Sequence, residues 1–259
     1  MPLDTSHGQS PAGTGETRPA EFRARRLNER VGEGDTGALL DTVLGSPLSG
    51  KLAVVSSFGA DSVALLHLVA ERRPDTPVLF IETRMLFPET MDYQTEVARS
   101  LGLTDIRVIR ATHTDLAAHD PDGTLHRSNP DACCALRKTI PLDRALEGFD
   151  TWITGRKRFQ TSARANLPRI ETEGPRVKVN PLADWTPEEV RGHIAEAGLP
   201  PHPLVAQGYP SIGCVPCTSR VAPGEDTRAG RWRGSDKDEC GIHFIDGKAV
   251  RSPKRETVS

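Results

Sequence analysis

The 259-residue chain contains no run of about 18 apolar residues, and charge of neither sign prevails, with 33 Lys and Arg against 35 Asp and Glu. The first absence excludes a membrane-spanning helix, and the formal charge of −2 argues against a dedicated electrostatic binder of DNA or membrane surfaces. The N-terminus also lacks a short apolar stretch before a small-residue cleavage site. We therefore expect a cytoplasmic protein with no membrane and no nucleic acid among its partners.

Cysteine and aromatic residues are also few. Five cysteines in a reducing compartment do not form a disulfide scaffold, and we interpret them as metal ligands or reactive thiols. Seven Phe, three Trp and two Tyr offer few rings for stacking on bases. The length suits one large domain or two small ones and is enough to bury a core.

Strand-like and helix-like segments alternate along the middle of the chain. The short apolar run at 52–55 is typical of a buried parallel strand, and further strands are predicted at 78–81, 106–109, 151–154 and 177–179. Helices are expected at 21–30, 38–44, 63–71 and 132–138, and also from Pro88 and from Pro187. This alternation indicates a single α/β domain at 21–222, with a mostly parallel twisted sheet flanked by helices. We expect a disordered tail at 1–20 and a mobile tail at 223–259.

The loop from Ser56 to Ser62 lies between a predicted strand and a predicted helix. Its backbone N–H groups and the helix dipole are suited to receive an anion at the carboxyl edge of a parallel sheet. No Gly-Lys-Ser/Thr sequence closes the loop, so it is not a Walker loop. An ordinary strand-to-helix turn with Ser or Asp as N-cap explains this segment equally well.

Four of the cysteines form two pairs, Cys133-Cys134 and Cys214-x-x-Cys217. Four thiolates suit either tetrahedral zinc or an iron–sulfur cluster. Adjacent cysteines on a helix point apart by about 100°, a divergence that a larger cluster spans better than one ion. The alternative is that the first pair consists of small buried hydrophobic residues and the second is a separate redox pair.

The fifth cysteine, Cys240, lies among charged and small residues, with Arg228, Arg231, Arg233 and Lys237 upstream. Cationic neighbours stabilise a thiolate and make such a thiol nucleophilic. A lone exposed cysteine without function, in an ordinary solvated tail, is equally compatible with this segment.

Six further motifs follow the Ser56 loop in a fixed order. They are Cys133-Cys134-x-x-Arg137-Lys138-x-x-Pro141-Leu142, Thr154-Gly155-Arg156-Lys157-Arg158-x-Gln160, Asn180-Pro181-Leu182-x-x-Trp185, Gly213-Cys214-x-x-Cys217-Thr218, Arg228-x-Gly230-Arg231-Trp232 and Glu239-Cys240-Gly241-Ile242-His243. Together with the loop, they resemble the iron–sulfur branch of the assimilatory adenylyl-sulfate reductases, within the phosphoadenylyl-sulfate reductase family and the PP-loop, or adenine nucleotide alpha hydrolase-like, superfamily. The resemblance covers roughly residues 50–245.

The resemblance implies a reaction. The Cys240 thiolate attacks the sulfur of adenosine 5′-phosphosulfate, AMP leaves, and thioredoxin or glutaredoxin releases sulfite from the resulting cysteine S-sulfonate. The family's cluster-free members lack both cysteine pairs, so the resemblance implies a [4Fe–4S] cluster held by Cys133, Cys134, Cys214 and Cys217.

The resemblance also implies roles for individual residues of the nucleotide-binding domain and of the C-terminal tail. The catalytic residues, besides Cys240, are His243, Arg228, Arg231 and Lys138. The substrate-binding residues are Ser56, Ser57, Phe58, Gly59, Asp61, Ser62, Thr83, Arg137, Arg156 and Arg158. Lys157 is expected to be an ordinary surface charge.

Some positions depart from the family's pattern. Phe58 stands where the PP-loop has a glycine, which disfavours ATP pyrophosphate chemistry, and Glu82 and Arg84 replace the Asp and Gly of an Asp-Thr-Gly opening. The same reaction on 3′-phosphoadenosine 5′-phosphosulfate is the alternative. More distant alternatives are a zinc-stapled nucleic-acid-binding module and a tRNA-thiolating PP-loop enzyme. The sequence leaves a homo-oligomer open.

Overall fold

The fold is described from a computed structural model that covers residues 19–234, 237, 244–245 and 248–249. Its strands are β1 (Leu52–Ser56), β2 (Val78–Ile81), β3 (Ile106–Ile109), β4 (Thr151–Thr154), β5 (Ile170–Glu173), β6 (Arg176–Val179), β7 (Phe244–Ile245) and β8 (Lys248–Ala249). None of the helices in this part of the chain is long and apolar enough to cross a membrane.

The helices follow the strands along most of the chain. The α-helices are α1 (Pro19–Val31), α2 (Thr36–Gly45), α3 (Ser62–Ala70), α4 (Pro88–Ser100), α5 (His113–His119), α6 (Leu125–Ser128), α7 (Pro130–Cys134), α8 (Ile140–Ala145) and α9 (Pro187–Glu196). A π-helix, η2 (Ala135–Thr139), joins α7 to α8. Short 3₁₀ turns are η1 (Pro47–Ser49), η3 (Arg158–Gln160), η4 (Ser162–Arg164), η5 (Val205–Gln207) and η6 (Val215–Cys217).

The main sheet has six strands in the order β3-β2-β1-β4-β6-β5. All neighbours are parallel except β5 and β6, which form an antiparallel pair. The chain runs outward from β1 to β2 and β3, and then returns to place β4 on the other side of β1. The carboxyl ends of β1 and β4 therefore meet at a topological switch point, where open α/β sheets bind their ligands.

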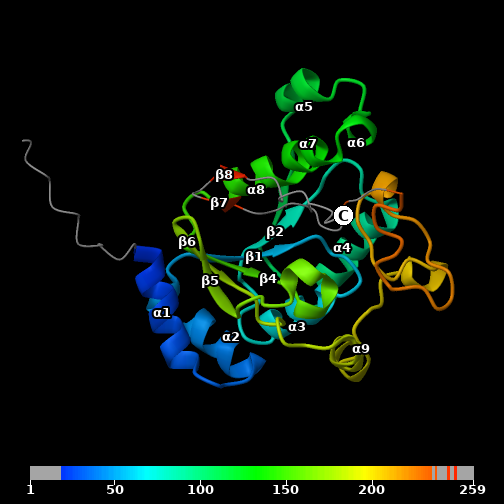
Figure 1. Cartoon of the computed structure of the whole chain (residues 1–259). Helices are drawn as coiled ribbons and strands as arrows, with labels where there is room; N and C mark the ends of the chain where they lie inside the picture. Colours follow the sequence, from blue (N-terminus) through cyan, green and yellow to red (C-terminus); the bar gives the residue numbers. More distant parts are fainter. Residues whose placement is uncertain (1–18, 235–236, 238–243, 246–247, 250–259) are drawn as a thin grey trace, which may run out of the picture.

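Alternate residues of each strand face opposite layers of helices. In β1, Leu52 and Val54 belong to the core that α1, α2, α3 and α9 cover, whereas Ala53 faces α8. Figure 1 shows the first group of helices on one side of the sheet and α8 on the other. Because both faces are buried, β2 is apolar throughout and β1 is apolar up to Ser56, as is usual in parallel sheets.

The structure confirms the predicted fold class. The strands at 78–81, 106–109 and 151–154 have the predicted bounds, and α9 begins with the expected capping box of Thr186 and Glu189. Strand β5 was not predicted. Helix α1 begins at Pro19, inside the range 1–20 that we assigned to the tail, and Ala20 is buried.

Candidate active site

The Ser56–Ser62 loop leaves the carboxyl end of β1 and leads into α3. The Ser56 hydroxyl accepts a hydrogen bond from the Phe58 N–H at 3.1 Å, and the Ser62 N–H donates to the Gly59 carbonyl at 2.9 Å. Asp61 is the N-cap residue of α3, but its side chain makes no capping hydrogen bond. The loop thus lies at the switch point, as an anion-binding loop would.

Phe58 occupies the place of a glycine at the cost of backbone strain. Its φ angle is +50°, in the left-handed region that disfavours side chains, and its ring is fully buried at 5.0 Å from the Phe80 ring centroid. Burial of the ring offsets the strain. The side chain of this predicted substrate-binding residue therefore packs in the core, and only its backbone faces the loop.

Lys157, from the segment that follows β4, meets this loop. The expectation of a surface charge was wrong, since Lys157 is only 1% exposed. Its Nζ donates to Asp61 Oδ2 at 3.3 Å and to the Gly155 carbonyl at 3.1 Å. Burial lowers the pKa of Lys157, and the Asp61 carboxylate opposes that shift.

Four cysteines from two distant segments line one pocket. Cys133 and Cys134 come from α7, and Cys214 and Cys217 from the segment around η6. The same pocket is lined by Met85, His126, Pro130, Arg137, Lys138 and Pro216. Cys133, Cys134 and Cys214 are buried, and Cys217 is the most accessible of the four. Burial raises the pKa of Cys133, whereas the charge of Arg137 opposes that rise.

The turn after β2 connects this pocket to the sheet. Thr83 Oγ1 lies 3.2 Å from the Cys214 Sγ, and the Val215 N–H donates to the Met85 carbonyl at 2.7 Å. Arg84 has a φ angle of +60°, and its N–H donates to the Glu82 carboxylate, which also accepts from Arg110 Nε at 2.6 Å. Glu82 and Arg84 are the two residues here that depart from the family's pattern. They act together, because the Glu82 carboxylate holds the strained turn at Arg84.

Arg137 is buried beside the cysteines and ion-paired with Asp120. One guanidinium nitrogen lies 2.5 Å from Asp120 Oδ2, and another donates to the Thr83 carbonyl at 3.1 Å. The third nitrogen, Nε, is buried and has no hydrogen-bond partner among the described residues. Lys138, the next residue, is half-buried and lines the same pocket.

Arg228 and Arg231 come from a segment that pairs with the cysteine loop. Thr218 and Arg231 form an antiparallel bridge, and the Trp232 N–H donates to the Cys217 carbonyl at 3.1 Å. The Arg231 guanidinium stacks on the Trp232 ring at 4.5 Å and packs so closely on Gly213 that a Cβ there would collide with it. Residues 223–234, part of the segment that we assigned to the tail, are thus tied to the cysteine loop.

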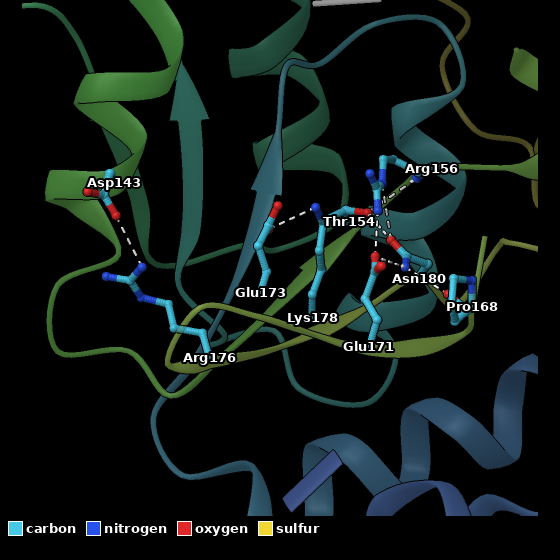
Figure 2. Close-up of polar contacts among 9 residues, drawn as sticks. All are labelled: Asp143, Thr154, Arg156, Pro168, Glu171, Glu173, Arg176, Lys178 and Asn180. Atoms are coloured by element: carbon cyan, nitrogen blue, oxygen red, sulfur yellow. Dashed lines mark hydrogen bonds and ion pairs between the residues drawn. The ribbon is translucent and has the colours of Figure 1, made fainter. Parts of the chain in front are cut away.

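Arg156 is held by a polar network on β5 and β6 (Figure 2). It donates to Glu171 Oε1 at 2.5 Å, and its Nε lies 3.4 Å from Asn180 Oδ1. Asn180 is fully buried and also accepts a hydrogen bond from Thr154 Oγ1 at 2.7 Å. Arg158, in contrast, is paired with Asp184 and with the Leu167 carbonyl, and it does not line the cysteine pocket.

Two predicted catalytic residues, Cys240 and His243, lie outside the described residues. Four residues of the site were missed by sequence reasoning, namely Asp120, Lys157, Glu171 and Asn180. Lys157 and Asn180 stand inside quoted motifs, so their position was a usable signal. Asp120 and Glu171 carried no such signal, because they lie outside the motifs and their partners are 17 and 15 positions away in the sequence.

The pocket suits a metal cluster by its donor set. It brings four sulfur ligands together with a buried N–H donor of Arg137, and thiolates with nearby hydrogen-bond donors are the usual environment of iron–sulfur centres. This fit concerns the chemistry of the donors and not their arrangement, because no group of three or more His, Cys, Asp or Glu side chains in the described part of the chain is placed to hold a metal ion. The four cysteines are the residues that could hold a cluster.

Together the fold and the pocket define an α/β protein with a strand-to-helix loop at the switch point and a pocket lined by four cysteines. Residues 51–220 match the phosphoadenosine phosphosulfate reductase domain, and the chain belongs to that family. This membership confirms the family that the motifs indicated.

Individual relatives agree with the family. The chain is 51% identical over 194 residues to an adenosine 5′-phosphosulfate reductase of Mesorhizobium japonicum, covering 75% of this chain and 76% of the relative. It is 45% identical over 226 residues to the enzyme of that name from Chelativorans sp., covering 87% and 92%. A phosphoadenylyl-sulfate reductase structure from Candida auris superposes with a TM-score of 0.64 at 27% identity, covering 78% of this chain and 98% of that one.

Proposed function

We propose that this enzyme reduces adenosine 5′-phosphosulfate to sulfite and AMP, as the names of its relatives at 45% and 51% identity suggest. The observation that carries the proposal is the four-cysteine pocket, because it joins two cysteine pairs that are 80 positions apart in the sequence. The activity belongs to sulfate assimilation. We assign the enzyme to the cytoplasm, where its five thiols stay reduced.

The nucleotide binds at the switch point in this proposal. The backbone around Ser57 and Gly59 receives the phosphate, because the N-terminus of α3 and its N–H groups favour an anion there. Arg137, Lys138, Arg228 and Arg231 supply positive charge for the sulfate. An anionic thiolate can approach an anionic substrate only where fixed cations offset the repulsion between them.

Cys240 supplies the nucleophile. Its thiolate attacks the substrate sulfur, a bond forms between the two sulfur atoms, and the bond from sulfur to the bridging phosphate oxygen breaks, so that AMP leaves with that electron pair. A thiolate of thioredoxin or glutaredoxin then attacks Cys240 Sγ and releases sulfite. The second thiol of that partner resolves the mixed disulfide, so both electrons come from the dithiol. His243 orients an oxyanion, and the part of the chain that follows residue 234 brings Cys240 to the substrate and then to the partner.

Cys133, Cys134, Cys214 and Cys217 would hold a [4Fe–4S] cluster in this enzyme. When bound, the cluster supplies a local charge that orders the pocket and tunes its field. Arg137 keeps a buried guanidinium beside these cysteines, and Lys138 lines the same pocket. In this proposal, these side chains hold the sulfate end of the substrate next to the cysteine loop.

The proposal is tested by trapping the intermediate. Anaerobically purified protein is incubated with adenosine 5′-[³⁵S]phosphosulfate without reductant, and the labelled peptide is identified. We expect one sulfonate on Cys240, which thioredoxin releases as sulfite. Retention of label by Cys240→Ser would refute the assignment of the nucleophile.

A product assay decides between the two nucleotides. Release of AMP from adenosine 5′-phosphosulfate is compared with release of adenosine 3′,5′-bisphosphate from the 3′-phosphorylated substrate, and we expect the first to be faster.

The cluster is tested separately by iron analysis and visible absorbance. About four irons per chain are expected in the wild type, with loss of iron in Cys217→Ser. A zinc-containing, colourless protein would contradict the cluster.

A further inference from the structure

We propose that Lys157 is a positioning residue of the nucleotide site, which neutralises Asp61 and fixes the Ser56–Ser62 loop so that it can accept a phosphate. This inference rests on the proposed function, because it concerns the nucleotide that the loop would bind. Neither the motifs nor the comparisons assign a role to Lys157.

The first observation is how completely Lys157 is buried. Its side chain is 1% exposed, and the Nζ donates to Asp61 Oδ2 at 3.3 Å and to the Gly155 carbonyl at 3.1 Å. A buried ammonium group is costly unless it is paired. A lysine at such a position is retained at a cost in free energy, and the carboxylate that it faces belongs to the anion loop.

The second observation is where the two partners lie in the sheet. Asp61 follows β1, whereas Gly155 and Lys157 follow β4, and these strands are parallel neighbours. The contact from Lys157 to Asp61 therefore crosses the topological switch point. A single side chain joins the two loops between which a ligand of this fold binds.

The third observation concerns charge. Asp61 occupies the N-cap position of α3, at the end where the helix dipole and the N–H groups favour an anion. Its carboxylate would therefore repel a phosphate that binds there. Lys157 opposes that charge from the buried side of the loop, whereas the Asp61 side chain is 41% exposed, so that solvent screens part of its repulsion of a phosphate. The charges of Arg164 and Arg228 lower the pKa of Lys157 further.

Lys178 provides an internal comparison. It is also buried, at 2% exposure, and its Nζ pairs with Glu173 Oε2 at 2.8 Å (Figure 2). Burial lowers its pKa as well. However, Lys178 lies within β6 and stacks on the Trp152 ring at 4.4 Å, and its carboxylate partner belongs to β5 rather than to the loop. A general effect of losing a buried lysine should therefore appear equally at both positions.

The experiment measures AMP binding by calorimetry and thermal unfolding for the full-length protein, purified anaerobically. We expect Lys157→Met to weaken AMP binding at least 10-fold and Lys178→Met to weaken it less than 3-fold. The two substitutions should lower the melting temperature to a similar extent. Lys157→Arg, which keeps the charge, should recover most of the affinity. A loss below 3-fold in Lys157→Met, or equal losses at the two lysines, would overturn the inference.

A double-mutant cycle identifies Asp61 as the group through which Lys157 acts. In the Asp61→Asn background there is no carboxylate to neutralise, so adding Lys157→Met should weaken AMP binding less than 3-fold. An undiminished loss in that background would also overturn the inference. If Lys157→Met does not fold, Lys157→Gln in both backgrounds carries the same test.

The two proposals fail differently. If the wild-type protein binds no AMP, the proposed function fails before any variant is compared. If the wild type binds AMP and releases it from adenosine 5′-phosphosulfate, but Lys157→Met binds equally well, only the role of Lys157 is lost.

Discussion

Asp120 and Arg137 form an ion pair that is buried on both sides, with Oδ2 and a guanidinium nitrogen 2.5 Å apart and the side chains 2% and 6% exposed. Asp120 follows α5, and Arg137 lies in the π-helix that carries the chain away from Cys133 and Cys134. The pair thus ties the π-helix with Arg137, which lines the cysteine pocket, to the segment around Asp120, which contributes no cysteine. π-Helical turns are frequent at functional sites, and this one sets the direction of Arg137.

The first prediction concerns this pair. Asp120→Asn keeps the shape of the side chain but leaves a buried guanidinium without its counter-charge, so we expect the free energy of unfolding to fall by about 3–5 kcal/mol. Urea titration measures it. The matched control is Asp115→Asn, which breaks the 2.6 Å pair with Arg144 where the side chains are 26% and 51% exposed. That change should cost less than about 1 kcal/mol, and equal losses would contradict the prediction.

The second prediction concerns the strained loop residue Phe58. Removing its buried ring should cost about 3–5 kcal/mol in Phe58→Ala. Phe58→Gly loses one more methyl group, but at a φ angle of +50° glycine avoids the strain that alanine keeps. We therefore expect the glycine variant to be more stable than the alanine variant by about 1 kcal/mol.

Phe80 serves as the control for Phe58, because the two rings touch but Phe80 lies in β2 with extended backbone. There the order should reverse, with alanine more stable than glycine by about 0.5–1 kcal/mol. Urea unfolding of the four variants gives both differences. The same order at both positions would show that the left-handed backbone of Phe58 does not matter.

Sequence reasoning succeeded where the signal was local. The segments at 78–81 and 151–154 were predicted as strands with the bounds that the structure shows, because buried parallel strands are rich in apolar residues. Both cysteine pairs were recognised from their spacing, and the structure brings them to one pocket. The Ser56–Ser62 loop was placed correctly between a strand and a helix, because a strand, small residues and a helix follow one another in the chain.

The misses arose from contacts between distant segments. Strand β5 has polar residues, and it is a strand because it pairs antiparallel with β6, which a scan for apolar runs cannot detect. Lys157 resembled a surface charge because lysine is seldom fully buried, and its partner lies 96 positions away. Glu171 could not be recognised before β5 was known, since that strand brings it to Arg156.

The third prediction concerns Asn180, which links Arg156 to the sheet. Its Nδ2 donates to the Pro168 carbonyl at 2.8 Å and to Glu171 Oε1 at 3.0 Å. Asn180→Asp replaces this donor with an oxygen anion that faces two acceptors, so we expect a loss of about 3 kcal/mol in the free energy of unfolding. The matched control is Asn129→Asp, because Asp caps a helix as well as Asn does and α7 should keep its stability within about 0.5 kcal/mol. Similar losses in the two variants, measured by urea titration, would refute the role of the Asn180 amide.

The last prediction concerns pH and His202, a buried histidine that packs on Tyr93. Its Nδ1 accepts a hydrogen bond from the Leu204 N–H at 3.2 Å, and its Nε2 lies 3.1 Å from Thr90 Oγ1. Burial lowers the pKa of His202 from 6.5 to about 4, because the charged form would lose water, and the charge of Glu89 opposes that shift. The folded state therefore binds fewer protons than the unfolded state between these values.

The stability that His202 contributes is present above pH 6.5 and is lost as the pH falls toward 4. Since one pKa unit corresponds to about 1.4 kcal/mol, the total loss is up to about 3 kcal/mol. His202→Asn does not titrate in this range, so its free energy of unfolding should fall less steeply with acid than that of the wild type. Urea titrations of both proteins at matched pH isolate this difference, because other acid effects are common to the two. Parallel pH profiles would mean that His202 is protonated in the folded state as readily as in the unfolded chain.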